Sequence, residues 1–242
     1  AGAEEALFCT DLARLLLRYK AIGGSGFQAA LGGAAHAVLR EGFGCGLECF
    51  ASPLNARSAP FCSGFVDTDA PFGSLGSFLA FRPRQGSFEA NPPFVPALVL
   101  AMAAHMTALL EAAAQGGRPL LFALCVGASS AMRHGAAWAA LQGLASGAFG
   151  RAQWCVQLQH HGYTEGHQHI AKGSVQQAAR MSSCDSSIFI FATTAAARRW
   201  PVTLEKEAAL RAAMSHTIPR NFKRASQASK ALHQERKKQR KR

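Results

Sequence analysis

The tetrapeptide Asn91-Pro92-Pro93-Phe94 constrains the fold of this chain more than any other stretch. Two consecutive prolines fix φ at both positions, remove two backbone donors and hold Asn91 in an extended conformation. A segment restricted in this way continues neither a helix nor a central strand. Because residues 87–90 are predicted to form a strand that leads into it, we predict a rigid corner just past a strand end, where sites form in open α/β sheets.

The groups carried by this corner suit a planar base with an exocyclic amine. The side-chain oxygen of Asn91 and the carbonyl of Pro92 are both acceptors, and together they can hold the two hydrogens of an adenine amino group. Phe94 can stack on the ring face, which contributes about 1–3 kcal/mol per base. The alternative is a simple turn, because Asn-Pro is a common turn starter. The tetrapeptide taken alone is compatible with both interpretations.

Segments of strand composition alternate with segments of helical periodicity, which favours an α/β sheet flanked by helices. Helices are predicted at residues 4–20, 27–41, 95–114, 136–144 and 204–214. Strands are predicted at residues 47–51, 61–66, 78–81, 87–90, 120–126, 154–158 and 188–193, and the polar segment 160–169 is predicted to be a loop. The strand at 120–126 is apolar throughout, as expected inside a sheet covered on both faces.

Positive charge is concentrated at the end of the chain. The formal net charge is +12, and residues 220–242 hold 10 Lys or Arg and one acid, Glu235, so that this basic tail carries most of it. A role in binding nucleic acid, an acidic partner or the nuclear import machinery therefore belongs first to the tail. The alternative is a solvated end without a specific role.

Two broader properties also follow from the composition. Seven cysteines without a C-x-x-C pair predict free thiols in a reducing compartment. No membrane span is predicted, because His105 and Glu111 interrupt the most apolar helical stretch, residues 97–114.

The order of motifs along the chain matches a cofactor site followed by a substrate site. Glu48 and Phe50 stand at the end of the first predicted strand and precede a turn of small residues, 51–53. Asp67, or Asp69, then follows at a second predicted strand end. A Rossmann-like sheet uses such an acid to hold both ribose hydroxyls. With the proline corner next, this is the layout of an S-adenosylmethionine-dependent amino methyltransferase.

Several longer motifs resemble one family in collinear order over roughly residues 15–210. They are E-C-F-A-S-P-L-N (48–55), F-x-D-T-D-x-x-F-G-S-x-G (65–76), G-S-F-E-A-N-P-P-F (86–94), H-x-Y-x-x-G-x-Q-H-I (161–170) and A-x-x-x-W-P-V-T-x-E (196–205). Together they resemble the catalytic domain of the phosphorylated CTD-interacting factor family, which are cap-specific adenosine-N6 methyltransferases.

The resemblance implies a Rossmann-like S-adenosylmethionine-dependent methyltransferase that methylates the 6-amino group of the adenosine next to the messenger RNA cap. It also implies a nuclear enzyme that binds capped mRNA and associates with RNA polymerase II. The expected catalytic set is Asn91, Pro92, Pro93 and Phe94. The expected S-adenosylmethionine-binding residues are Glu48, Phe50, Ser52, Asn55 and Asp67. The implied organisation is an N-terminal helical segment (1–46), a methyltransferase domain (47–218) and the basic tail (219–242).

The chain also departs from the family pattern. The WW module that binds the phosphorylated polymerase tail is absent, and so is most of the helical domain. Pro96 replaces an acidic residue implicated in substrate contact, and residues 126–130 replace a Trp-Arg-Glu-Pro-Pro segment that helps to hold the cap. The second hypothesis is therefore a catalytically inactive methyltransferase fold that serves as an RNA-binding or scaffold component of a ribonucleoprotein.

A histidine cluster is the remaining candidate for chemistry. His160, His161, His167 and His169 lie within ten residues, but no other residue with ligand spacing joins them. We therefore predict no metal site. The segment is predicted to lie over the site, where His161, Tyr163 and His169 contact RNA or pack structurally.

Overall fold

The computed structural model describes residues 2–22, 29–165 and 179–218, and a five-stranded sheet forms its centre. The spatial order is β2-β3-β4-β8-β5. These strands are β2 (Leu47–Glu48), β3 (Gly86–Ala90), β4 (Leu120–Gly127), β8 (Ser186–Ala192) and β5 (Gly150–Val156). β2, β3 and β4 are parallel, and β8 lies antiparallel between β4 and β5. The α/β prediction is therefore confirmed as a mixed sheet with helices.

β4 shows why the sheet is covered on both faces. All eight of its residues are buried, and successive side chains of a strand point to opposite faces. Phe122 and Leu124 belong to one apolar cluster, whereas Leu121 and Ala123 belong to a second cluster on the other face. A strand in this position needs apolar side chains at every residue, and the sequence 120–126 supplies them.

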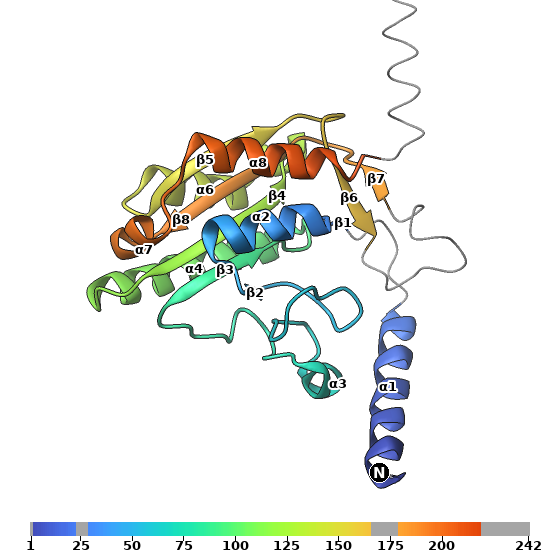
Figure 1. The fold of residues 1–242 in the computed structure, drawn as a ribbon. Coiled ribbons are helices and arrows are strands. Elements are labelled where there is room, and N and C mark those ends of the chain that lie inside the picture. The colour runs from blue at the N-terminus through green and yellow to red at the C-terminus, as the bar shows by residue number, and fades with distance from the viewer. Residues whose placement is uncertain (1, 23–28, 166–178, 219–242) are drawn as a thin grey trace, which may run out of the picture.

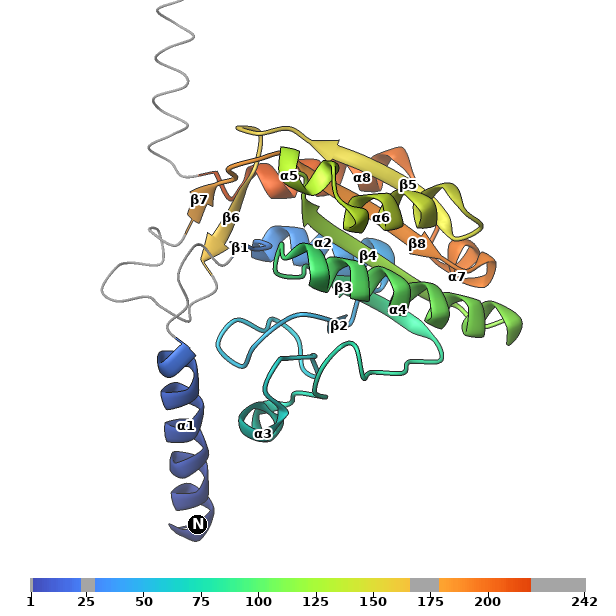
Figure 2. The same ribbon diagram turned by 180° about the vertical axis from the view of Figure 1, so that it is seen from behind.

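Helices form a layer on each face of the sheet. α4 (Pro96–Gln115) and α6 (Ala136–Ser146) pack on the face of Phe122, next to the short α5 (Ser130–Arg133). α2 (Gly33–Phe43), α7 (Thr194–Arg199) and α8 (Leu204–Ser215) pack on the face of Leu121. Figure 1 shows α2 and α8 in front of the sheet, and Figure 2 shows α4 and α6 in front of its other face.

The helix α4 connects the parallel strands β3 and β4. Pro96 opens it, which is a position where proline is tolerated because its missing N–H has no partner in the helix. Contrary to the sequence prediction, α4 is long and apolar enough to cross a membrane by length and composition. A core helix meets the same criterion, and Val99, Met102 and Met106 of α4 are fully buried in the cluster shared with β4 and α6.

The segment between β2 and β3 is mostly irregular, and two strands predicted there are wrong. Phe61 forms only isolated bridges to Glu48 and Ser74, and residues that follow form the short helix α3 (Val66–Asp69) and the 3₁₀ turn η1 (Ala70–Phe72). Phe78 begins a turn instead of a strand. Both phenylalanines are nearly fully buried. They anchor a loop to the core. The apolar residues around such an anchor resemble a short strand in composition.

A second sheet of three short strands lies beside the main sheet. Its order is β1 (Ala29–Ala30), β6 (Gly162–Glu165) and β7 (Ala179–Met181), with both pairs antiparallel. The predicted loop at 160–169 is therefore wrong over β6, and the predicted helix at 27–41 begins later, at Gly33. Strands of two to four residues give almost no periodic signal in a sequence.

The N-terminal helix α1 (Gly2–Ile22) extends away from the sheet and approaches α3 (Figure 1). Only Leu15 and Tyr19 of this helix are buried. The hydroxyl of Tyr19 donates to Asp69 Oδ2 at 2.7 Å, and Arg18 pairs with Asp67. α1 therefore attaches through its last turns and through a ring contact between Phe8 and Phe72, whereas α2 is part of the core. The domain boundary at residue 46 stays a prediction, and the tail from residue 219 lies outside the described residues.

Candidate active site

A cavity of about 620 Å³ opens where the parallel strands β2 and β3 end. Its wall comes from β1, the start of α2, the residues after β2, the proline corner and the start of α4. The predicted residues that line this cavity are Glu48, Phe50, Asn55, Asn91, Pro92, Pro93 and Phe94. The carboxyl edge of a parallel sheet is where ligands bind in open α/β folds, and the volume is that of a small-molecule site.

Asn91 is held by one end of its amide and is unpaired at the other. Its Nδ2 donates to the backbone carbonyl of Ala29 in β1 at 2.6 Å. Its Oδ1 is buried and has no hydrogen-bond partner among the described residues. Leaving a buried acceptor unpaired costs about 1–3 kcal/mol. The arrangement therefore presents a fixed acceptor to a donor that arrives from the cavity.

The two prolines make a rigid connection from β3 to α4. The N–H of Val95 donates to the carbonyl of Pro93 at 2.7 Å, which closes the corner just before α4 begins. Pro92 is buried, whereas Pro93 is exposed. The predicted corner past a strand end is confirmed, because β3 ends at Ala90.

The ring of Phe94 fits against the end of β4. A Cβ built on Gly127 would lie 2.6 Å from Cδ2 of Phe94, so the ring approaches the backbone of β4 where only glycine leaves room. On another side it meets the edge of Tyr163, with ring centroids 6.1 Å apart. Phe94 is half-buried and lines the cavity. One part of the ring is therefore fixed by packing while another part remains available for stacking.

Glu48 organises the loop after β2. Its Oε1 accepts hydrogen bonds from the backbone N–H groups of Arg57 at 2.6 Å and Ser58 at 3.0 Å. Its Oε2 lies 3.7 Å from Nε2 of His36. Burial raises the pKa of Glu48. Burial and, secondarily, the Arg57 charge lower the pKa of His36 to about 4, so this histidine is neutral at pH 7. Oε1 of Glu48 is thus occupied by hydrogen bonds from the backbone of the loop.

Ser52 and Asn55 stabilise the turn between these groups. The backbone N–H of Ser52 donates to Asn55 Oδ1 at 2.7 Å, and the hydroxyl of Ser52 donates to the same oxygen at 3.1 Å. Ser52 is buried and does not line the cavity, whereas Asn55 does. Phe50 packs on Phe78 with ring centroids 5.3 Å apart and turns its remaining surface to the cavity.

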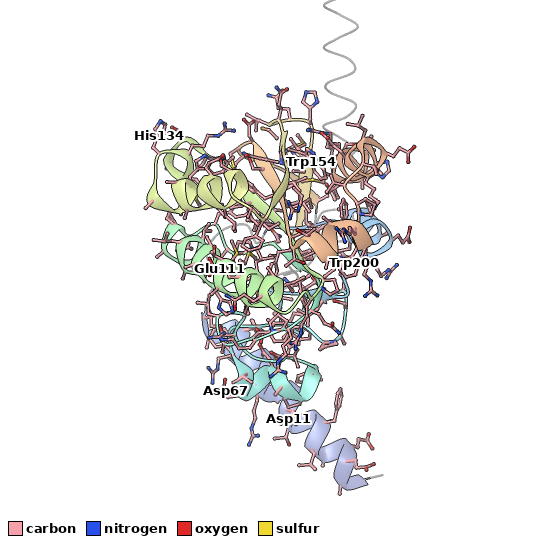
Figure 3. The ribbon with its side chains drawn as sticks, turned by 90° about the vertical axis from the view of Figure 1, so that its left-hand side faces the viewer. Asp11, Asp67, Glu111, His134, Trp154 and Trp200 are labelled. Carbon is pink, nitrogen blue, oxygen red and sulfur yellow. The ribbon has the colours of Figure 1, made fainter. Side chains whose placement is uncertain are left out.

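Asp67 does not lie at a strand end, which corrects the geometry expected for a ribose-binding acid. It belongs to α3, its side chain is 59% exposed, and its partner is Arg18 of α1. Figure 3 shows it on α3, at the end of the molecule opposite Trp154. The alternative acid, Asp69, is buried and accepts the hydrogen bond of Tyr19. Neither aspartate lines the cavity, because α3 faces α1.

The acid that does line the cavity besides Glu48 is Glu89, which sequence reasoning missed. It is buried, and its Oε1 has no partner among the described residues. Burial, and secondarily the charge of Glu48, raise the pKa of Glu89 well above its ordinary value. A usable signal was present: Glu89 and Asn91 are two residues apart, so the strand period places them on one face.

His161 and Tyr163 are buried in the small sheet and do not line the cavity. Nε2 of His161 and the hydroxyl of Tyr163 both meet Oγ of Ser186, and Nδ1 of His161 lies 3.0 Å from the carbonyl of Gln157. This burial favours the structural role for His161 and Tyr163, and contact with RNA stays a prediction. His169 lies outside the described residues, and no group of three possible metal ligands occurs within the described ones.

Comparison with known proteins places the chain in a family. A family model described as the phosphorylated CTD interacting factor 1 WW domain matches residues 2–166, more than half of the 242 residues. The chain belongs to the phosphorylated CTD interacting factor family. This confirms the sequence resemblance. Although the description names a WW domain, the matched residues in this family member include the helix α1, the cavity wall and most of the main sheet.

Two relatives whose names state an enzymatic activity are each similar to the chain over 154 residues. The chain is 40% identical over 154 residues to the Mus musculus mRNA (2'-O-methyladenosine-N(6)-)-methyltransferase and 39% identical over 154 residues to that of Homo sapiens. Each match covers 62% of this chain and 20% of the relative. The chain thus spans about a fifth of the length of the curated relatives it matches.

Proposed function

We propose that this chain is an adenosine-N6 RNA methyltransferase that uses S-adenosylmethionine, and that its sheet is the Rossmann-like sheet of such enzymes. The observation that carries the proposal is the orientation of Asn91. Its Nδ2 is bound to Ala29, and its Oδ1 is a buried acceptor without a partner among the described residues, on the wall of a cavity at the carboxyl ends of parallel strands.

The corner residues act on the acceptor amine. Oδ1 of Asn91 and the carbonyl of Pro92 accept the two N–H hydrogens of the adenine amino group, which draws the nitrogen toward tetrahedral geometry. Phe94 stacks on the base and fixes its plane. The base enters unstacked, because its amine is inaccessible within a helix of paired bases. Catalysis by these residues is mainly positioning and electrostatics, and no strong base is required.

The cavity fits the methyl donor by its size and by its unpaired acceptors. S-adenosylmethionine supplies an electrophilic methyl group on a sulfonium. Phe50 offers an aromatic face, and Asn55 offers an amide from the loop after β2. Glu89 offers a buried carboxyl oxygen that has no hydrogen-bond partner among the described residues. Glu48 and Ser52 were also expected to bind the cofactor, and their hydrogen bonds shape this loop.

The finer assignments come from the relatives and the resemblance. We propose capped mRNA as the substrate class, with the cap-adjacent adenosine as acceptor, because the relatives are named for 2'-O-methyladenosine in mRNA. Nuclear localisation and association with RNA polymerase II are proposed on the resemblance and on the basic tail. Pro96, which opens α4 beside the cavity wall, favours the second candidate, an inactive fold that binds RNA or serves as a scaffold.

Methylation of capped and uncapped RNAs that begin with adenosine, measured side by side with mass spectrometry of the product, tests the proposal. We expect N6-methyladenosine in the capped RNA at a rate at least tenfold higher than in the uncapped RNA. N6-methylation of both at equal rates would retain the enzyme and remove the cap specificity. Absence of product from both RNAs, together with absence of S-adenosylmethionine binding, would establish the inactive fold.

A further inference from the structure

A second, smaller cavity of about 220 Å³ adjoins the active-site cavity between α2, β2 and β3. His36, Glu48 and Glu89 line both cavities. We call the smaller one the side chamber. It lies on the same face of β3 as Glu89 and continues the active-site cavity away from the proline corner. A ligand that fills the larger cavity can therefore extend one end into the side chamber.

Glu89 gives the side chamber an acceptor with no partner. The residue is 3% exposed, and its Oε1 has no hydrogen-bond partner among the described residues. Buried polar atoms in proteins are nearly always paired, so such an atom indicates a missing donor. Asn91, the next residue on this face, holds the other unpaired oxygen of the wall. From the rise of a strand, the two Cα atoms are roughly 7 Å apart.

The side chamber has an acidic residue at its buried end and a basic residue at its exposed end. Glu89 is buried, whereas Arg57 is exposed and has no carboxylate within 4 Å among the described residues. Oε1 of Glu48 is occupied by the loop, and the lowered pKa of His36 leaves that ring neutral at pH 7. No metal-binding cluster forms among the described residues here. An inner acid with an outer cation complements a small zwitterion.

We infer that the side chamber takes the α-amino acid end of the methyl donor, with Glu89 accepting a hydrogen bond from its ammonium group and Arg57 facing its carboxylate. The inference rests on the proposed function, because the nucleoside end of the same ligand must occupy the active-site cavity. It assigns Glu89 as a binding residue for the amino acid end, a different role from the ribose-binding role expected of Asp67.

This assignment couples binding to a proton. Burial raises the pKa of Glu89 well above its ordinary value, so Glu89 holds its proton to a higher pH than an exposed carboxyl group does. An ammonium group favours the carboxylate form, so binding releases the proton of Glu89 to solvent. The other titratable or charged groups around it are Glu48, His36, Arg40, Arg57, Cys45, Cys49 and Cys125. The three thiols have raised pKa values and stay neutral.

Calorimetry with two ligands tests the inference without relying on turnover. S-adenosylhomocysteine carries the amino acid end, and 5'-methylthioadenosine lacks it. We expect Glu89→Gln to weaken S-adenosylhomocysteine binding at least tenfold and to leave 5'-methylthioadenosine binding within twofold of the wild-type value. Retained binding of the second ligand also shows that the variant is folded. Glu41→Gln, the same change on the exposed side of α2, is the matched control and should alter neither affinity.

A second measurement uses the wild-type chain alone. Titrations at pH 7 in phosphate and in Tris, which differ in ionisation enthalpy, should reveal release of up to one proton with S-adenosylhomocysteine and none with 5'-methylthioadenosine. The inference is overturned if Glu89→Gln affects both ligands equally or neither, or if no proton is released. Failure of the wild-type chain to bind either ligand would instead refute the cofactor site of the proposed function.

Discussion

The two connections between parallel strands of this sheet differ in how they hold their residues. From β3 to β4 the chain passes a proline corner and then a long helix, whose fully buried residues pack against β4. From β2 to β3 it passes 37 residues, 49–85, of mostly irregular structure held by single anchors such as Phe61 and Phe78. Both connections contribute to the wall of the candidate active-site cavity.

The difference separates two kinds of site residue. In the proline corner the backbone itself is rigid, so side-chain atoms such as Oδ1 of Asn91 can remain without a protein partner. The irregular connection is held by hydrogen bonds between Ser52 and Asn55 within it and by those that its backbone donates to Glu48, the last residue of β2. We therefore expect substitutions in the corner to act on methyl transfer, whereas substitutions in the irregular connection act on affinity or on local stability.

Asn91→Ala should have the largest effect. Removal of the fixed acceptor is expected to lower the methyl-transfer rate by about 10²–10³-fold, a magnitude typical of losing one preorganised electrostatic contact. The affinity for S-adenosylmethionine should stay within about threefold, because in the proposed function Asn91 contacts the base and not the methyl donor. Radiolabelled methyl transfer and calorimetry on one preparation measure both. A variant that keeps full turnover would remove the catalytic role of the corner.

Gly127→Ala should have an intermediate effect that acts through Phe94. The added Cβ would lie 2.6 Å from the ring, so Phe94 must shift. Overpacking of this kind costs about 1–3 kcal/mol of unfolding free energy, and displacement of the stacking ring should reduce the transfer rate about tenfold. Urea unfolding and the transfer assay measure the two effects.

Gly143→Ala in α6 is the matched control, since a Cβ there meets nothing within 4 Å. It should leave the transfer rate unchanged and stabilise the helix by up to about 1 kcal/mol. Equal transfer rates for Gly127→Ala and Gly143→Ala would show that the position of Phe94 does not limit methyl transfer.

Asp67→Asn should have the smallest effect. Its pair with Arg18 is largely exposed, and exposed pairs contribute about 0–1 kcal/mol to stability. Because Asp67 lies outside the cavity, the affinity for S-adenosylmethionine should change less than twofold in a calorimetric titration. A loss of tenfold or more would restore Asp67 as a ribose-binding acid and would require α3 to turn toward the cavity.

The regular parts of the fold could be predicted from sequence because their patterns are local. The apolar strand β4, the helix α4 and the helix α8 each extend over enough residues to show their period and burial. The strands predicted at 61–66 and 78–81 failed because buried single phenylalanines imitate strand composition. The short strands β1, β6 and β7 depend on partners far along the chain, which no local pattern encodes.

The candidate site divides in the same way. The corner was predictable, since the restriction on Asn91 comes from its next neighbours. The absence of Asp67 and Asp69 from the cavity wall was not, because Asp67 pairs with Arg18 and Asp69 with Tyr19, both on a helix almost fifty residues away. The burial of His161 depends likewise on Ser186 of β8. Glu89 was not predicted as a site residue, although strand alternation places it on the same face as Asn91.

The two prolines of the corner also determine at which step the conformational entropy of the corner is lost. Fixing the backbone of one residue costs about 1–2 kcal/mol of conformational entropy at 25 °C. Pro92 and Pro93 have little of this freedom even in the unfolded chain, so the acceptors beside them are ordered during folding and at low cost. In the proposed function, a base that enters the cavity uses none of its binding energy to order the corner. More of that energy then remains to favour the geometry of methyl transfer.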